Sequence, residues 1–267
     1  MHDYTNLLII KLFINLSYRN LIYLKTKKYK TLLLVLFIFS RVNAQKTTKF
    51  NEKGVDYYEP RLVVPGDFSS PPSDAITLFD GKDFSKWKHS KTGKPVKWTL
   101  NSDKSMTVKP GTGSIETIKE HKSVQLHIEW KSPIENKGEG QMRGNSGIFF
   151  QGRYEVQVLN SYQNKTYPDG QAGSIYKQHI PLVNSMRPTG EWQVYDIVFN
   201  APIYNNMGKI IKPGNFTVFH NGVLIQNNVE IKKPTMSIEK DARKTLMLQD
   251  HDKNGTVSYR NIWMRKI

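Results

Sequence analysis

Hydrophobic and polar residues alternate along much of the chain after about residue 75. In the segment 124–131, the apolar residues Val124, Leu126, Ile128 and Trp130 take every second position. Successive side chains of a strand point to opposite faces, so this period of two predicts a half-buried β-strand. Shorter patterns of the same kind predict further strands at 76–79, 106–109, 147–151, 154–159, 193–199, 216–218, 223–225, 245–249 and 258–265.

Short turn sequences join two pairs of these predicted strands. Asn221-Gly222 separates the strands at 216–218 and 223–225. Asn and Gly tolerate the positive φ angles of a two-residue primed turn, so a hairpin is predicted here. Gly152-Arg153 is expected to form a second hairpin, and no long segment shows a helical period.

About ten strands without a helical crossover predict an all-β fold. Two antiparallel sheets packed face to face, connected as in a jelly-roll sandwich, fit this pattern, and a barrel is the alternative. The segment 160–191 is an exception because it has no clear period. Its tyrosines, Tyr162, Tyr167 and Tyr176, favour a folded functional loop.

The N-terminal region has the pattern of an export signal. Four lysines between residues 25 and 30 precede the apolar run Leu32–Phe39, and Val42-Asn43-Ala44 places small residues before Gln45. A basic segment, a short apolar core and small residues at the cleavage site are typical of a secretory signal. We therefore expect a signal peptide at 1–44, a polar, proline-bearing lead-in at 45–75 and the sandwich domain at 76–267.

The apolar run of eight residues is too short to cross a bilayer, which takes about 20 residues. A second apolar stretch, 7–14, is interrupted by Lys11. The simplest explanation is that translation begins downstream of Met1, and a membrane anchor formed by both stretches is the alternative. The expected location is the periplasm or the medium, without stable membrane insertion.

The composition excludes several classes of site. The chain has no cysteine, which rules out disulfides, thiolate metal sites and a lipid-modified N-terminal cysteine. The net charge is +16, but residues 1–44 carry seven Lys/Arg and one Asp, and the remaining excess of 32 Lys/Arg over 22 Asp/Glu is spread along the chain. Without a basic patch, this charge indicates no nucleic-acid partner.

Candidate polar groups lie on the predicted strands. In the strand at 154–159, Glu155 and Gln157 share the face opposite the valines, where they are either solvated or part of a site. Asp250 and His251 end the strand at 245–249 and could supply a base with its hydrogen-bond partner, although a turn explains them equally well. Gly144-Asn145-Ser146-Gly147 could present amide groups to a ligand.

Several short motifs, in one order from about residue 76 to the C-terminus, resemble those of the exported bacterial 3-keto-disaccharide hydrolase domain. The motifs are Phe79-Asp80-Gly81-Lys82, Gly144 to Phe150, Tyr154 to Leu159, Tyr167 to Gly173, Gly190-Glu191-Trp192-Gln193, Phe219 to Gly222, Leu248 to His251 and Arg260 to Trp263. This resemblance implies a concanavalin A-like, glucanase-type sandwich and a hydrolase that acts on glycosidic bonds.

The resemblance also implies a particular chemistry. A ketone at sugar C3 acidifies the hydrogen at C2, so that loss of this proton can expel the group on C1 before water adds. The carbohydrate substrate would then need an upstream sugar oxidoreductase to make the ketone. Gln157 stands where a second carboxylate would be expected in a glycosidase with two carboxylates, which favours elimination or binding.

On this basis we expect Glu155 to be the base, His251 the acid and Asp250 the residue that orients His251. Arg143, Lys177 or a divalent metal held by the first three residues could stabilise the enolate, although no spacing rule confirms a metal. A non-catalytic carbohydrate-binding module of the same fold is the alternative. The expected substrate contacts are Asn145, Gln157, Tyr167, Tyr176, Trp192 and Gln249.

Overall fold

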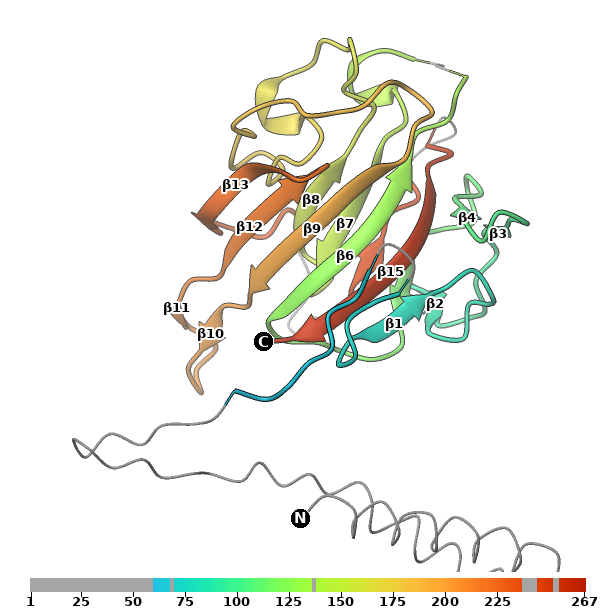
Figure 1. Cartoon of the computed structure of the whole chain (residues 1–267). Coiled ribbons are helices and arrows are strands. Elements are labelled where there is room, and N and C mark those ends of the chain that lie inside the picture. The colour runs from blue at the N-terminus through green and yellow to red at the C-terminus, as the bar shows by residue number, and fades with distance from the viewer. Residues whose placement is uncertain (1–59, 68–69, 136–137, 237–243, 252–254) are drawn as a thin grey trace, which may run out of the picture. The chain divides into compact units, whose positions relative to one another are not determined.

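The alternating segment at 124–131 forms the central strand β6 (Val124–Lys131), and its buried and half-buried residues alternate as expected. The computed structural model describes residues 60–67, 70–135, 138–236, 244–251 and 255–267 (Figure 1). Residues 63–267 form one unit, which holds both sheets and the site.

The larger sheet has eight strands in the order β13-β12-β9-β6-β15-β4-β3, and β1 also pairs with β15. All of these pairs are antiparallel. The other members are β1 (Ile76–Phe79), β3 (Thr99–Leu100), β4 (Met106–Thr107), β9 (Gln193–Asn200), β12 (Asn215–His220), β13 (Val223–Glu230) and β15 (Ser258–Lys266).

The smaller sheet has the antiparallel order β2-β5-β14-β7-β8. Its strands are β2 (Trp87–His89), β5 (Ile115–Thr117), β7 (Ser146–Phe150), β8 (Tyr154–Val158) and β14 (Met247–Leu248). A separate hairpin is formed by β10 (Ile203–Tyr204) and β11 (Ile210–Lys212). Within the described residues the helices are two 3-10 turns, η2 (Gly140–Met142) and η3 (Pro168–Gly170).

The hydrophobic core lies between the two sheets. Phe150 of the smaller sheet packs against Phe199 and Phe216 of the larger one, with ring centroids 4.9 and 5.2 Å apart. Trp130 is fully buried, as its strand parity predicts. Two separate sheets that share this core make a sandwich, which confirms the predicted fold class rather than the barrel.

The hairpin at Asn221-Gly222 is confirmed, because both residues have positive φ angles, of 52° and 81°. In the second hairpin, which joins β7 to β8, the positive angles fall on Gln151 and Gly152, so the turn begins one residue earlier than predicted. The predicted strand at 245–249 is only two residues long in the structure.

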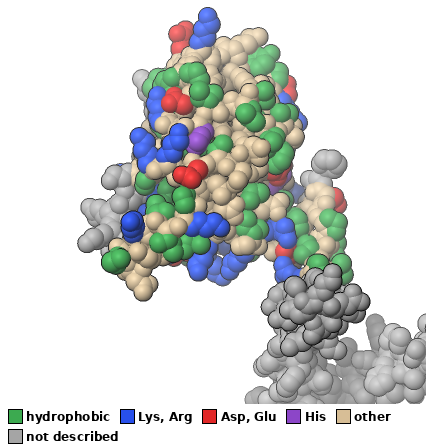
Figure 2. Space-filling view, turned by 90° about the vertical axis from the view of Figure 1, so that its left-hand side faces the viewer, with side chains coloured by type: hydrophobic (Ala, Val, Ile, Leu, Met, Phe, Trp, Pro, Cys, Tyr) green, Lys and Arg blue, Asp and Glu red, His purple; other side chains and the backbone are tan. Residues whose placement is uncertain are grey.

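The predicted signal peptide at 1–44 lies outside the described residues. Among those that are described, no helix is long and apolar enough to cross a membrane. The end of the lead-in is attached to the larger sheet, because Arg265 donates to both carboxylate oxygens of Asp74, at 2.6 and 2.8 Å. On the face shown in Figure 2, Lys and Arg side chains occur in several separate places among hydrophobic and uncharged ones.

Candidate active site

The site is built on β8, the last strand of the smaller sheet. Tyr154, Val156 and Val158 belong to the hydrophobic core, so Glu155 and Gln157 point to the opposite face, as the alternation predicts. These two side chains are nevertheless only 4% and 1% exposed. A carboxylate and an amide on the outer face of a sheet remain buried only if other chain segments cover them.

Part of that cover comes from the loop at 160–191, which lies at the top of Figure 1. Its segment 173–176 follows the free edge of β8. The Gly173 amide donates to Gln157 O at 2.9 Å, and the Tyr176 amide donates to Glu155 O at 3.2 Å. This pairing places the Tyr176 side chain at the same site as Glu155, which supports the expectation of a folded loop.

A cavity of about 200 Å³ opens beside Glu155. Residues from β7, β8, the end of β14, the long loop and the segment after β13 converge on it. The lining residues are Asn145, Phe149, Glu155, Gln157, Tyr176, Thr235, Met236, Gln249 and His251. Six of the eleven site residues predicted from the sequence therefore meet in one cavity.

Gly147 makes room for the carboxyl group of Glu155. It pairs with Gln157 across the β7–β8 ladder and therefore lies on the same face of the sheet as Glu155. A Cβ atom on Gly147 would lie 2.5 Å from Glu155 Oε1 and 2.6 Å from the Phe149 ring. A glycine is therefore required at this position for the carboxyl group to lie against the strand.

Burial controls the acidity of Glu155. Removal from water raises the pKa of its carboxyl group to about 8, because a charged carboxylate is disfavoured in a low-dielectric site. The Gln157 amide lies 3.1 Å from Glu155 Oε1, and with its nitrogen turned to Glu155 it donates to that oxygen and to Ser146 O. The Gln157 amide thus contacts the titratable carboxyl group of Glu155 directly.

Two buried amide oxygens of the cavity, Asn145 Oδ1 and Gln249 Oε1, have no hydrogen-bond partner among the described residues. The Asn145 nitrogen is occupied, because it donates to Gln141 O at 2.7 Å. A buried acceptor without a partner costs about 1–3 kcal/mol, so these oxygens are suited to a ligand with hydroxyl donors. Sugars are ligands of this kind.

Tyr176 belongs to a chain of polar groups that leads away from the cavity. Its hydroxyl lies 2.6 Å from the Tyr167 hydroxyl. The Lys177 ammonium group lies 3.1 Å from the centroid of the Tyr167 ring and 3.5 Å from Asp169 Oδ1. Burial and the hydrogen bond to Tyr176 raise the pKa of Tyr167, so its hydroxyl keeps its proton. Tyr167 therefore contacts the cavity residue Tyr176, and Lys177 contacts Tyr167, but neither of the two lines the cavity.

The structure places three further predicted residues away from the cavity. Asp250 Oδ2 accepts from the Gly113 amide, in the segment before β5, at 2.8 Å. Arg143 Nη1 donates to a loop carbonyl, Gln163 O, at 3.3 Å. The guanidinium carbon of Arg260 lies over the Trp192 ring, 4.0 Å from its centroid. Of the predicted catalytic residues, Glu155 and His251 are the two that line the same cavity.

A metal site made from these groups finds no support in the described part of the chain, where no three His, Cys, Asp or Glu side chains are grouped to hold an ion. Asp250 is directed to Gly113 and does not line the cavity with Glu155 and His251.

Sequence reasoning missed four residues of the site. Phe149 could have been found, because it alternates with Gly147 on the same face of β7. Gln141 Oε1 lies 3.0 Å from the amide group of Gln157, but Gln141 lies in a 3-10 turn with no periodic signal. Thr235 and Met236 come from a distant segment whose approach to β8 depends on the tertiary fold, since the Thr235 amide donates to Arg153 O.

Known proteins resemble this chain over most of the sandwich. A curated "3-keto-disaccharide hydrolase" of Bacteroides thetaiotaomicron is 29% identical in an alignment 191 residues long, which covers 56% of this chain and 62% of that protein. The match thus spans less than two thirds of that relative.

Solved structures agree with this likeness. A protein of Parabacteroides distasonis, provisionally named a glycosyl hydrolase, is 44% identical with a TM-score of 0.73, over 79% of this chain and 94% of that one. A second protein of the same organism, named in the same way, shares the fold, with 21% sequence identity and a TM-score of 0.53. The match covers 73% of this chain and 94% of that one. The model of the 3-keto-alpha-glucoside-1,2-lyase-like domain matches residues 74–265, and the chain belongs to this family.

Proposed function

We propose that this protein cleaves 3-keto glycosides by elimination followed by hydration. The observation that carries the proposal is Glu155, a buried carboxyl group with a pKa raised to about 8, in a cavity that also presents His251 and two unpartnered amide oxygens. A site that only binds sugars needs the amides but no carboxyl group with such a pKa.

In the first step, Glu155 removes the proton from C2 of the sugar. The electron pair of the broken C–H bond becomes part of an enolate with the ketone at C3. A carboxylate with a raised pKa is a stronger base than an ordinary one, which favours this transfer. The Gln157 amide, 3.1 Å from Glu155 Oε1, holds the carboxylate in place by donating to it.

In the second step, the enolate restores the C3 carbonyl, a double bond forms between C1 and C2, and the bond from C1 to the aglycone oxygen breaks. His251 donates the proton that this oxygen needs. Water then adds to C1 while C2 regains a proton, so the sum of the steps is hydrolysis.

The enolate oxygen needs a donor, and the Tyr176 hydroxyl at the cavity can supply one. If the Tyr167 hydroxyl donates to Tyr176, the Tyr176 proton is available for the substrate, and the two oxygens are 2.6 Å apart. Such a donor typically stabilises developing charge by about 3–4 kcal/mol. Arg143 and Lys177 do not line the cavity, so Tyr176 replaces them in this role.

The first test is Glu155→Gln. We expect this variant to keep its fold and to lose at least about 1000-fold in aglycone release from a 3-keto-glucoside, because an amide cannot accept the C2 proton. Release from the unoxidised glucoside should be absent in both proteins, because C2 is then not acidic.

Glu116→Gln is the matched control. Glu116 is a buried carboxylate of the same sheet, which receives the Thr245 hydroxyl at 2.9 Å and does not line the cavity. Its variant should release the aglycone at nearly the normal rate. Full activity of Glu155→Gln would refute the assignment, and sugar binding without release by the wild type would favour the carbohydrate-binding module.

We also propose that the protein is exported and acts after a sugar oxidoreductase. The basic and apolar pattern of residues 1–44 supports export, and the ketone at C3 requires a prior oxidation of the sugar hydroxyl. N-terminal sequencing of the protein from its native host tests the first part, and a mature chain that retains Leu32–Phe39 would contradict it.

A further inference from the structure

The hairpin of β10 and β11 projects from one end of the larger sheet (Figure 1). It connects β9 to β12, and its base is closed by the pair of Asn200 and Asn215. Every residue of the two short strands is exposed. Because successive side chains of a strand point to opposite faces, both faces of the hairpin are in contact with solvent.

Most of the exposed side chains of this hairpin are hydrophobic. Met207, in the turn, is 87% exposed, and Ile211 is 64% exposed. Single exposed apolar residues are ordinary, but several together, on an element that buries neither face, mark a surface that contacts a partner or a membrane. The hydrophobic residues are Ile203, Tyr204, Met207, Ile210 and Ile211.

The base of the hairpin is fixed to the sandwich. The Tyr204 hydroxyl lies 2.8 Å from the Tyr154 hydroxyl of β8. The Ala201 amide donates to Ser123 Oγ, just before β6, at 3.0 Å. These contacts hold the hairpin in its projecting position, so its hydrophobic residues are presented to the surroundings.

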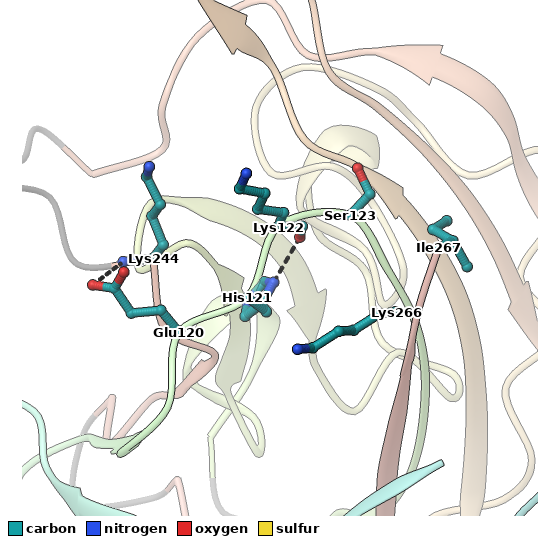
Figure 3. A pocket seen from close by; sticks show the side chains of 7 residues that line it. All are labelled: Glu120, His121, Lys122, Ser123, Lys244, Lys266 and Ile267. Atoms are coloured by element: carbon teal, nitrogen blue, oxygen red, sulfur yellow. Dashed lines mark hydrogen bonds between the residues drawn. The ribbon is translucent and has the colours of Figure 1, made fainter. Parts of the chain in front are cut away.

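Exposed lysines flank the base on both sides. On the β6 side, Lys122 directly precedes Ser123, the residue that receives the Ala201 amide. Lys122 and Ser123 also line a cavity of about 370 Å³. Figure 3 shows that the ammonium group of Lys122 is directed away from His121, the buried ring of that cavity. Lys122 is therefore an exposed cation beside the hairpin.

On the β13 side, the Ile231 amide donates to Gly214 O at 2.9 Å, which joins the end of β13 to the end of the hairpin. The two residues that follow, Lys232 and Lys233, are exposed. Lysines from three segments thus meet around one hairpin. The exposed lysines of this end are Lys122, Lys209, Lys212, Lys232 and Lys233.

The charge around the hairpin is positive. Residues 201–214 contain Lys209 and Lys212 and no Asp or Glu. The acidic residues nearest in the chain to the five lysines are Glu120 and Glu230. Within the described residues, none of the five lysines forms an ion pair with a carboxylate. A hydrophobic tip surrounded by cations is complementary to a surface that is both apolar and anionic.

We propose that this end of the sandwich binds reversibly to an anionic phospholipid surface. Met207 and Ile211 enter the boundary between head groups and acyl chains, and the lysines contact the lipid phosphates. A second copy of this chain is a poor partner for the same surface, because it would bring like charges together. A nucleic acid would meet the lysines but leave the hydrophobic residues in water. The attachment is peripheral and does not depend on the proposed chemistry.

The test is vesicle sedimentation with the protein isolated from its native host. Vesicles of phosphatidylcholine with about one third phosphatidylglycerol are compared with vesicles of phosphatidylcholine alone, at low salt. We expect the anionic vesicles to bind at least about tenfold more tightly, and the difference to shrink in about 1 M salt because salt screens the lysines.

Variants locate the binding. Lys209→Gln combined with Lys212→Gln should weaken it about 30-fold, since each lysine near the lipid contributes about fivefold. Met207→Ser combined with Ile211→Ser leaves the charge unchanged and should weaken it at least about tenfold, because apolar area is no longer buried.

The matched controls lie elsewhere on the sandwich. Lys91→Gln combined with Lys94→Gln removes two exposed lysines from the turn after β2, at the edge of the smaller sheet. Ile134→Ser removes a residue that is 77% exposed and follows the opposite end of β6. Both variants should bind the anionic vesicles normally.

A label reports the depth of the hairpin directly. Because the chain has no cysteine, Met207→Cys carries a single environment-sensitive dye. We expect its emission to shift to the blue and to increase on anionic vesicles, whereas the same dye on Lys94→Cys should not respond.

Unchanged binding in both hairpin variants overturns the proposal, as does equal binding to the neutral vesicles. Binding that needs the lysines while the dye at residue 207 stays silent would indicate attraction to any polyanion, which also overturns it. Aglycone release in solution should stay normal in the Lys209→Gln, Lys212→Gln variant, because neither residue lines the Glu155 cavity. Failure of turnover in the wild type, with vesicles still bound, would refute only the proposed function.

Discussion

At the scale of single residues, the chemistry of the candidate site depends on how deeply Glu155 is buried. The same alternation that directs the valines of β8 inward directs this carboxyl group outward, and covering segments then remove it from water. Without that cover, a carboxylate on the outer face of a sheet would keep an ordinary pKa and would be a weak base.

Turnover should therefore depend on pH through Glu155. Because the base must be ionised and burial raises its pKa to about 8, kcat/KM for a 3-keto-glucoside should rise with pH up to about 8 and then level off. Below this value the rise should approach about tenfold per pH unit. Initial rates at low substrate concentration measure kcat/KM at each pH. A decrease of kcat/KM as the pH rises through about 8 would assign Glu155 as the acid instead.

Gly147→Ala tests the room that Glu155 requires. The new Cβ would lie 2.5 Å from Glu155 Oε1, so the carboxyl group must move. We expect kcat/KM to fall about 100-fold, since a displacement of about 1 Å has this effect, with a stability cost of about 1–3 kcal/mol. Kinetics and urea unfolding are the measurements, and normal activity would show that the carboxyl position does not matter.

At the scale of elements, the central strands of the larger sheet carry a polar network on their outer face. His127 of β6 lies 2.7 Å from Asp196 Oδ1 of β9 and 3.8 Å from Glu129 Oε1, and Trp263 of β15 stacks on its ring at 5.0 Å. Arg260 donates to Glu129 Oε2 at 2.6 Å. Three neighbouring strands are thus connected by charged side chains in addition to backbone hydrogen bonds.

This network should be visible in the titration of His127. Burial opposes the charged ring, but the two carboxylates prevail and raise the pKa of His127 to about 9. In Asp196→Asn we expect this pKa to fall by about 1–3 units, as measured by NMR. Because the folded pKa lies above the unfolded value, the stabilisation is complete below about pH 6.5 and is lost as the pH rises through about 9.

In the same NMR titration, the pKa values of the other histidines should be almost the same in Asp196→Asn as in the wild type. An unaltered His127 pKa in Asp196→Asn would mean that Glu129 alone sets it. Urea unfolding at pH 6 and pH 9 gives an independent measure, and the difference between the two should be smaller in the variant than in the wild type.

Long alternating patterns made some elements predictable and left others out. The strands β1, β6 and β9 were expected within one residue of their observed bounds, because they run for four to eight residues against the core. The sequence did not predict β2, β3, β5, β10 and β11, which have only two or three residues each. A pattern of that length contains no measurable period.

At the scale of the whole molecule, the two sheets are held together by an aromatic core, since the chain has no cysteine to cross-link them. The rings of Phe199 and Phe216 lie 5.0 Å apart in the larger sheet, and both contact Phe150 of the smaller one. Aromatic side chains of this size bury large apolar areas, so this cluster should contribute strongly to the stability of the sandwich.

Phe199→Ala measures that contribution. Phe199 is fully buried, so we expect the free energy of unfolding to fall by about 3–5 kcal/mol in urea titrations. Phe219→Ala, in the neighbouring strand β12, is the matched control because Phe219 is 37% exposed, and it should cost less than about 1 kcal/mol. Equal losses in both variants would contradict a core centred on Phe199.

The sequence by itself determined the all-β class, the faces of the long strands and the Asn221-Gly222 turn, because these follow from local periodicity and backbone preference. It also named Glu155 and His251 as candidates. Only the tertiary structure decided that Tyr176 and Thr235 approach Glu155, that Asp250 is directed to Gly113 and that Trp192 lies under Arg260. These contacts join segments far apart in the chain, and burial, which sets the pKa of Glu155, exists only once those segments have packed.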